Sequence, residues 1–291
     1  MIEFSRIVVS MSTAGVLTIA AGFYLRRSGL TRGSLPERAT FLGRVFEAAP
    51  LATFGALHLS AASGLSSMVP KYMGWPLFWT YLVGFALIAT ALSLIFDKAV
   101  RWSGLMSGSM FLIFAAMLSV PSVVAGHHDR FTLALLVREP AFAFGLIALG
   151  ASAGARSEGW SRVIGVCRIL IGAVAIFYSV EHFLHPEFLP GVPLEKTTPV
   201  WEPAARLWGY VIGGFLLVCG ALLLINRQAK RAAAWLGTAI VVAVIVVYLP
   251  LLVPAHGTDA MVEALDYIFD TMLFAGTVLI LAEALPRTEP K

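Results

Sequence analysis

The stretch that decides the fold is WTYLVGFALIATALSLIFDKAVRWSGLMSG, which runs from residue 79 to residue 108. Its pattern returns 129 residues later as WGYVIGGFLLVCGALLLINRQAKRAAAWLG, from residue 208 to residue 237. A proline and a histidine recur beyond it at the same offset, and an arginine and a histidine recur before it at an offset of 124. These four matched pairs are Pro121 with Pro250, His127 with His256, Arg44 with Arg168, and His58 with His182. Repetition at a fixed period indicates two copies of one structural unit, so any site must be sought in both copies.

The composition places the chain in a membrane. Hydrophobic residues make up 58% of it and charged residues only 13%, whereas a soluble domain usually carries about 25% charged residues. The apolar residues form blocks of about 18 to 22, which suffice to cross a hydrocarbon layer near 30 Å thick as helices. The sequence therefore predicts an all-α fold, a polytopic transmembrane helical bundle whose first partner is the lipid bilayer.

Nine transmembrane helices are expected. They fall near residues 7–25, 42–62, 77–96, 103–120, 140–155, 163–183, 205–225, 233–250 and 265–284. We divide the chain into an N-terminal helix with a basic loop (1–40) and two four-helix repeats (41–155 and 160–286). Because four crossings return the chain to the side on which it began, the two repeats are predicted to be parallel, related by an axis along the membrane normal.

Basic residues are concentrated in alternate loops, which the positive-inside rule places in the cytoplasm. This orientation puts the N-terminus outside and the C-terminus in the cytoplasm; the resemblance described below implies the inner (plasma) membrane of a bacterium. The other side keeps few basic residues, namely Arg6, Lys71, Arg130, Arg138, Lys196 and Arg206. Insertion topology accounts for the net charge of +4, so nucleic acid is excluded as a partner.

All six histidines fall at or beyond the outer ends of the predicted spans. The candidate outer-face site consists of four of them and four aromatic residues. These are His58, His127, His182 and His256 with Trp79, Tyr81, Trp208 and Tyr210. Two interpretations stay open for each kind of residue. The aromatic rings form an interfacial belt or line a pocket, and the imidazoles bond to backbone carbonyls or bind a metal or haem.

The weak candidates for metal ligation are His182 and His185, which lie three residues apart and so share a helical face, with Glu181 beside them. Pro186 limits this arrangement because the helix is expected to end there. The first repeat has no counterpart of His185. A symmetric pair of two-histidine sites is therefore not expected.

Arg44 and Arg168 are candidate polar residues at the cytoplasmic end. Each precedes the histidine of its repeat by fourteen residues, which is about 21 Å of helix on nearly the same face. The arginines reach the headgroups or cap a loop, or they belong to a path for protons or electrons. Glu47 lies three residues after Arg44 and is placed to pair with it, but the second repeat has Ile171 there.

Two further features describe the loops beyond the histidines. Val69-Pro70 and Val192-Pro193 recur at corresponding places. The second copy belongs to a proline-rich segment, 185–203, which we expect to pack over the helices as a lid or docking surface.

Each repeat resembles the DoxX-like family of small four-helix membrane proteins. The resemblance rests on four features: a first helix that begins with arginine, the histidine at its end, the Val-Pro loop, and Trp-x-Tyr-x-x-Gly at the start of the next helix. The resemblance covers both repeats, so the chain is similar to a fused, double-length member. It implies a link to respiratory or thiol redox chemistry, because the namesakes resemble subunits of a thiosulfate:quinone oxidoreductase and other members accompany oxidative-stress proteins. It supplies no catalytic residues. The two cysteines, Cys167 and Cys219, form no C-x-x-C pair, which argues against thiol–disulfide exchange.

The function expected from these features is support of a respiratory or thiol redox process, as a quinone-handling or anchoring subunit with an outer-face site. A quinone needs an apolar slot and one or two hydrogen-bond partners. The candidate cofactors are a quinone or a histidine-ligated metal or haem, and the candidate partners are other subunits of a membrane redox complex. The alternatives are a structural or assembly subunit and a transporter of a small or lipidic molecule. The sequence leaves open whether the chain is an enzyme.

Overall fold

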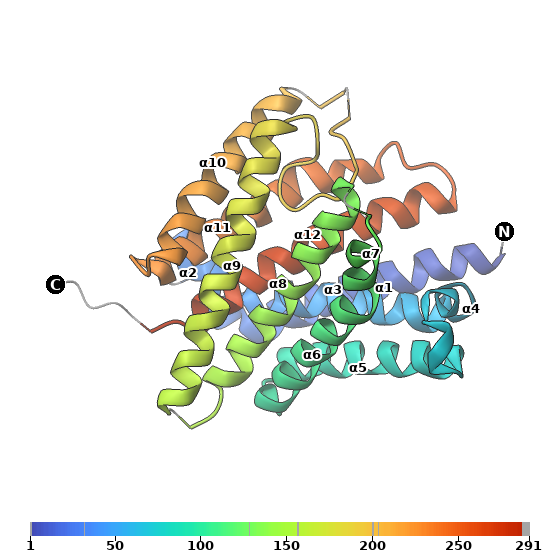
Figure 1. The fold of residues 1–291 in the computed structure, drawn as a ribbon, viewed down its shortest axis with the longest axis horizontal. Coiled ribbons are helices and arrows are strands. Elements are labelled where there is room, and N and C mark those ends of the chain that lie inside the picture. The colour runs from blue at the N-terminus through green and yellow to red at the C-terminus, as the bar shows by residue number, and fades with distance from the viewer. Residues whose placement is uncertain are drawn as a thin grey trace.

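The computed structural model describes residues 2–31, 33–127, 129–155, 157–199, 201–202 and 204–286, with side chains from residue 6 onward. Every regular element in these ranges is a helix (Figure 1), so the prediction of an all-α bundle is confirmed. Eight helices are long and apolar enough to cross a membrane, and the number rises to nine if one bent pair is counted as a span. The bend, of 89°, separates Gly43–Ser60 from Ala62–Met68, directly after His58.

The elements follow one another with short connections. The long helices are α1 (Ile2–Arg26), α3 (Gly43–Ser60), α5 (Pro76–Phe96), α6 (Val100–Phe114), α8 (Arg130–Ser152), α9 (Glu158–Leu184), α10 (Ala205–Leu224), α11 (Ala229–Ala243) and α12 (Thr258–Ala284). Short helices are α2 (Leu35–Phe41), α4 (Ala62–Leu65) and α7 (Val120–Val124), with single turns η1 (Arg27–Gly29), η2 (Ser66–Met68), η3 (Lys71–Met73) and η6 (Leu249–Leu252). Two π-helical turns, η4 (Ala115–Ser119) and η5 (Val244–Tyr248), continue α6 and α11.

Helix α8 begins at Arg130, well before the predicted start at 140. The cause is Asp129, whose carboxylate accepts hydrogen bonds from the backbone N–H and the hydroxyl of Thr132, at 3.0 and 2.8 Å, and caps the helix. The same two bonds hold the pKa of the Asp129 carboxyl below its usual range. Pro140 lies inside the helix and does not end it. As a result, residues assigned above to an outer loop, Arg138 among them, belong to the span.

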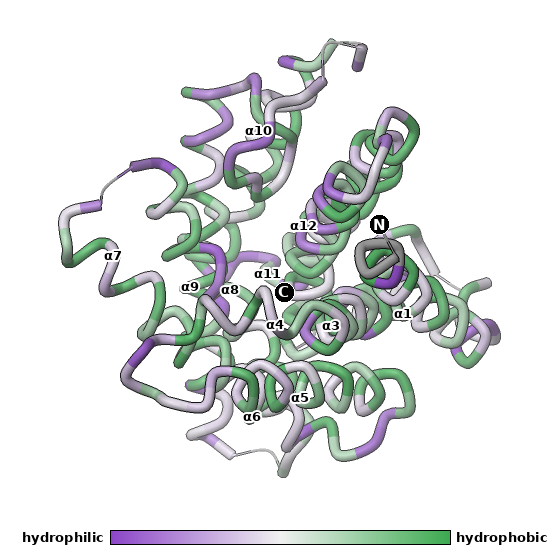
Figure 2. The backbone as a smooth tube through the Cα atoms, turned by 90° about the vertical axis from the view of Figure 1, so that its right-hand side faces the viewer, coloured by the Kyte–Doolittle hydropathy of each residue, from purple (hydrophilic) through white to green (hydrophobic). Residues whose placement is uncertain are grey.

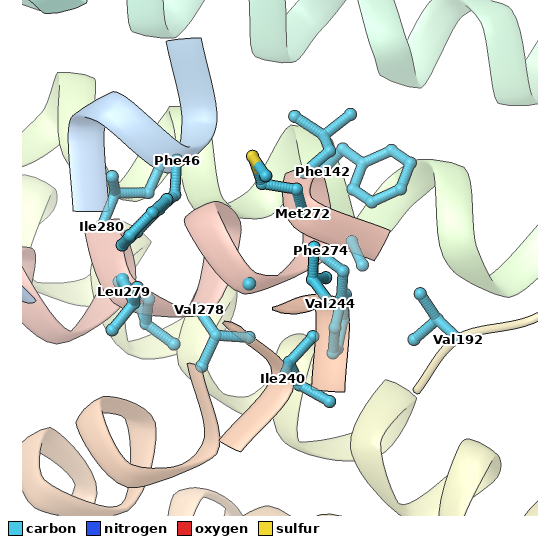
Figure 3. Packing of buried hydrophobic residues seen from close by; sticks show 14 of the residues in the cluster. Phe46, Phe142, Val192, Ile240, Val244, Met272, Phe274, Val278, Leu279 and Ile280 are labelled. Carbon is cyan, nitrogen blue, oxygen red and sulfur yellow. The ribbon is translucent and has the colours of Figure 1, made fainter. Parts of the chain in front are cut away.

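Helix α12 lies in the middle of the bundle. It contacts α3, α8 and α11, and Figure 2 shows its inner end at the centre of the bundle while its outer end projects from it. Around it the neighbours pair as α3 with α5, α6 with α8, α8 with α9, and α9 with α10. The hydrophobic colouring follows the helices, whereas hydrophilic stretches gather mainly at their ends and in the loops (Figure 2). A continuous core of α12 side chains with α3, α8 and α11 results, and Figure 3 shows Phe46, Phe142, Phe274, Val278 and Leu279 within it.

Unusual backbone conformations recur at the offset of the sequence repeat. Left-handed residues precede α5 and α10, at Trp75 and Ala204, which are 129 positions apart. Further left-handed residues lie in the turns before α6 and α11, at Asp97, Ala99, Asn226 and Gln228. The turns η4 and η5 occupy the same place in their helices at the same offset. The left-handed residues and the π-helical turns therefore recur at the same offset of 129 residues as the sequence motifs.

Glycines allow α12 to approach its neighbours closely. A Cβ atom on Gly276 would lie 2.5 Å from the backbone nitrogen of Glu47 on α3. A Cβ atom on Gly145 of α8 would lie 2.9 Å from the carbonyl oxygen of Thr277. Small residues at such crossings let membrane helices pack backbone against backbone.

Candidate functional site

A cavity of about 740 Å³ lies between α3, α5, α6, α8 and α12. Most of its lining is apolar, with Phe54, Leu87, Met110, Phe111 and Leu273 among the contributors. Other lining residues, Leu82, Met106 and Ile113, are also 46%, 69% and 54% exposed on the apolar outer surface of α5 and α6. The cavity therefore opens sideways, towards the hydrocarbon of the membrane.

Charged residues from the two central helices line one part of this cavity. Arg138 and Glu139 come from α8, and Asp266 and Asp270 come from α12. Arg138 and Asp270 form a buried ion pair, and Glu139 accepts a hydrogen bond of 2.8 Å from Ser119, the last residue of η4. Asp266 has no hydrogen-bond or ion-pair partner among the described residues. Three carboxyl groups thus face one guanidinium group.

His58 and Trp79 also line the cavity. His58 lies in the last turn of α3, and its Nδ1 is 2.8 Å from the carbonyl oxygen of Phe54. Trp79 lies in the first turn of α5, and its indole Nε1 is buried without a partner among the described groups. The second imidazole nitrogen of His58 therefore remains for a ligand, whereas the indole N–H of Trp79 is enclosed by the protein.

The corresponding histidine of the second repeat, His182, has different surroundings. His182 is 1% exposed, and its Nε2 lies 2.9 Å from the backbone nitrogen and 3.0 Å from the carbonyl oxygen of Gly191. Residues 189–193, here named the plug, are all buried. Tyr248 donates a hydrogen bond of 3.1 Å to the carbonyl of Pro190. Figure 3 shows Val192 reaching from its loop to the edge of the core.

The plug lies against residues that correspond, by the sequence offset of 129, to residues in or beside the cavity. A Cβ atom on Gly191 would lie within 4 Å of Ile240 and of the Tyr248 hydroxyl. The residues 129 positions before these two are Phe111, which lines the cavity, and Ser119, which bonds to the cavity residue Glu139. The expected packing of this loop over the helices therefore goes further than a lid, because five residues enter the bundle.

The other predicted outer-face residues lie outside the cavity. His127 and His256 are exposed in loops. Tyr81 and Tyr210 are 43% and 45% exposed, and Tyr210 stacks on Phe183 with 6.3 Å between ring centres. Trp208 packs against the core. The structure thus brings His58 and Trp79 together and leaves the remaining predicted residues apart from them.

The two weak metal candidates are not side by side on a helix. His182 bonds to the plug, whereas His185 follows the end of α9 and lies 3.5 Å from Glu187. Glu181 pairs with Arg130 at 2.5 Å. Within the described part of the chain, no group of three or more histidine, cysteine or acidic residues is arranged to hold a metal ion. His128 lies outside the described residues.

At the opposite end of the bundle, Arg44 binds Asp97 and Glu283 at 2.5 Å each, and Arg26 joins Asp97 at 2.9 Å. Glu47 is not the partner of Arg44, contrary to expectation. Its side chain is fully buried and accepts a hydrogen bond of 3.2 Å from Thr277 of α12.

Arg168 has a different role, because α9 begins at Glu158 and places it inside the helix. Its guanidinium donates to the carbonyl groups of Leu223 and Leu224 at the end of α10. It therefore caps that helix, one of the alternatives considered above.

Sequence reasoning missed the charged part of the cavity. Arg138 and Glu139 precede the span predicted at 140–155, so they were assigned to a loop. Asp266 and Asp270 fall inside the span predicted at 265–284, and ionisable residues within a span are by themselves a signal of function. That signal was present in the sequence.

No family model matches this chain, and neither a curated protein nor a solved structure shows a significant match to it. The cavity itself is therefore the strongest guide to function.

Proposed function

We propose that this membrane protein binds a lipid-soluble quinone in the cavity between α3, α5, α6, α8 and α12, and thereby supports a respiratory or thiol redox process. The observation that carries the proposal is the apolar cavity of about 740 Å³ that opens towards the membrane and contains titratable groups. A quinone partitions into the bilayer by its tail, and its ring needs a few hydrogen-bond partners in an apolar slot. The resemblance to DoxX-like proteins points to the same chemistry.

The polar groups available to the ring are His58, Glu139 and Asp266, and the Trp79 ring lines the same cavity. Conversion between quinone and quinol moves two protons with two electrons, and carboxyl and imidazole groups are suitable proton carriers. We propose that the electrons are exchanged with another subunit of a membrane redox complex, for which this chain holds or anchors the quinone.

We also propose that the two halves are parallel repeats and that the His58 and His182 ends face the outside of a bacterial inner membrane. The recurring left-handed turns and π-helical turns support the repeats. The concentration of basic residues in the alternate loops supports the orientation, with the N-terminus outside and the C-terminus in the cytoplasm.

The test is extraction of the purified protein. The wild type would be purified in mild detergent, extracted with organic solvent and assayed for quinone. Ser109 lines the cavity and is exposed, so Ser109→Trp fills the cavity without displacing core residues. Val211→Trp, on the 40% exposed outer face of α10, is the matched control. We expect quinone from the wild type and the control, and at least about tenfold less from Ser109→Trp.

Extracts free of quinone, together with no binding of added quinone, would contradict the proposal. Transport of a lipidic molecule is the second candidate, because Arg138, Asp270 and Glu47 place charged or ionisable side chains inside the bundle. Flux of a lipidic substrate across liposomes, abolished by Ser109→Trp, would favour it. An empty cavity and defined co-purifying subunits would favour the structural or assembly role.

A further inference from the structure

The hydrogen-bonding polarity of the cavity restricts the ligand it accepts. His58 Nδ1 lies 2.8 Å from the Phe54 carbonyl oxygen. A carbonyl oxygen only accepts hydrogen bonds, so Nδ1 carries the proton in this contact. In a neutral imidazole the other nitrogen, Nε2, is then an acceptor. Within the described ranges no group bonds to it, and a ligand must bring a donor to His58.

Glu139 and Asp266 also line the cavity, and a carboxyl group accepts hydrogen bonds whether or not it is protonated. The sole hydrogen bond to Glu139 from a described residue comes from Ser119. The Arg138 guanidinium is shared with Asp270. The acceptor whose direction is fixed by its own contact is therefore His58 Nε2.

In the second repeat the plug covers Nε2 of the matching histidine, His182, whose Nδ1 is buried without a partner among the described groups. The backbone N–H of Gly191 donates to His182 Nε2 at 2.9 Å. The Gly191 carbonyl oxygen also lies 3.0 Å from Nε2, so this nitrogen meets a backbone donor and a backbone acceptor of one residue. The plug occupies the place that corresponds to the cavity. A ligand beside His58 is expected to present a donor as the plug does.

We infer that the cavity selects the reduced, hydroxyl-bearing form of its ligand, a quinol in preference to the quinone. The inference rests on the proposed function. A quinol hydroxyl donates a hydrogen bond to His58 Nε2. A quinone carbonyl only accepts hydrogen bonds, so it brings no proton to this nitrogen. Sites that hydrogen-bond a hydroxyl group reject analogues that lack it.

The experiment compares three probes on the full-length protein in lipid nanodiscs under anaerobic conditions. They are decylubiquinol, decylubiquinone and the dimethyl ether of the quinol, which lacks both donors and cannot be oxidised readily. Quenching of tryptophan fluorescence reports binding, because Trp79 and Trp102 line the cavity. We expect the quinol to bind at least about tenfold more tightly than the quinone or the ether.

Substitutions of His58 test whether this residue causes the preference for quinol over quinone. His58→Phe is expected to bind quinol and quinone with equal, weak affinity. His256→Phe, an exposed residue outside the cavity, should keep the wild-type preference. If His58→Phe does not fold, His58→Gln replaces it. Its amide offers an acceptor and donors, so a reduced preference with binding retained is expected.

The outcomes separate the inference from the proposed function. Quinone binding as tight as quinol binding, or a preference that survives in His58→Phe, overturns the inference and leaves the quinone site intact. Failure of all three probes to bind overturns both. A lipophilic amine that binds more tightly than the quinol would replace the hydroxyl ligand with a cation and also overturns the inference.

Discussion

Arg138 and Asp270 join the two central helices through an ion pair whose side chains are 10% and 12% exposed. Removing one partner leaves the other charge unpaired in the bundle, which costs about 3–5 kcal/mol in buried pairs. Replacing both partners with apolar residues removes the desolvation cost as well. Arg138→Leu and Asp270→Leu are therefore each expected to lower stability by about that amount, and the double variant is expected to recover most of it.

The measurement is the unfolding free energy in detergent for the wild type, the two single variants and the double variant. A double variant as unstable as the sum of the singles would show that the two residues act independently. Ligand binding by the double variant reports separately on the cavity, which both residues line.

At the scale of single residues, sequence identified His58 and Trp79 but could not distinguish His58 from His182. Both are histidines in the last turn of a long helix, α3 or α9. Their surroundings differ because the segment between the histidine and the following Trp-x-Tyr motif is five residues longer in the second half. The extra length lets the plug reach His182. Such a tertiary contact leaves no periodic signal in the sequence.

The packing of α12 on α3 depends on Gly276. A methyl group there would lie 2.5 to 2.7 Å from backbone atoms of Glu47 and Phe46, which cannot rotate aside. Gly276→Ala is therefore expected to separate the helices and to cost about 1–3 kcal/mol or more. Gly214→Ala on α10 has no atoms within 4 Å of its new methyl group, and it should be neutral or slightly stabilising because alanine favours helix.

Thermal unfolding of the two variants, followed by circular dichroism in the same detergent, provides the comparison. Equal midpoints for both variants would mean that the α3–α12 contact adjusts without loss. A lowered midpoint for Gly276→Ala alone supports a fixed crossing.

At the scale of elements, the helices were predictable because the apolar blocks match the thickness of a membrane. Their boundaries were not. Two charged residues followed by a proline, at positions 138–140, are typical of a loop. In the structure they lie within α8, where Arg138 forms an ion pair with Asp270 of α12 and Glu139 accepts a hydrogen bond from Ser119. The span predicted at 42–62 ends at Ser60, and the chain bends there into a separate short helix, α4, that was not predicted.

For the whole molecule, α1 begins at the end of the bundle that carries α4, and α12 ends at the opposite end (Figure 1). The proposed orientation makes a definite prediction. Cysteines introduced at Tyr72 and Val253, which are 76% and 80% exposed, should both react with a membrane-impermeant maleimide in intact cells. A cysteine at Ile225, 65% exposed at the other end of α10, should react only after the membrane is opened.

Labelling at Tyr72 and Val253 on opposite sides would contradict the parallel arrangement of the halves. Labelling of Ile225 alone in intact cells would keep that arrangement and reverse the orientation. The cysteines already present, Cys167 and Cys219, are buried, so they add little background.

The plug also determines how many ligand molecules one chain can hold. Two copies of a binding unit ordinarily give two equivalents at saturation, but in the second copy residues 189–193 already occupy the corresponding space. Equilibrium dialysis with a radiolabelled quinol should therefore saturate at one equivalent per chain, along a simple hyperbola. Two equivalents would show that the plug leaves its place when ligand is present. One equivalent would fit a duplicated sequence that has enlarged the scaffold without doubling its capacity.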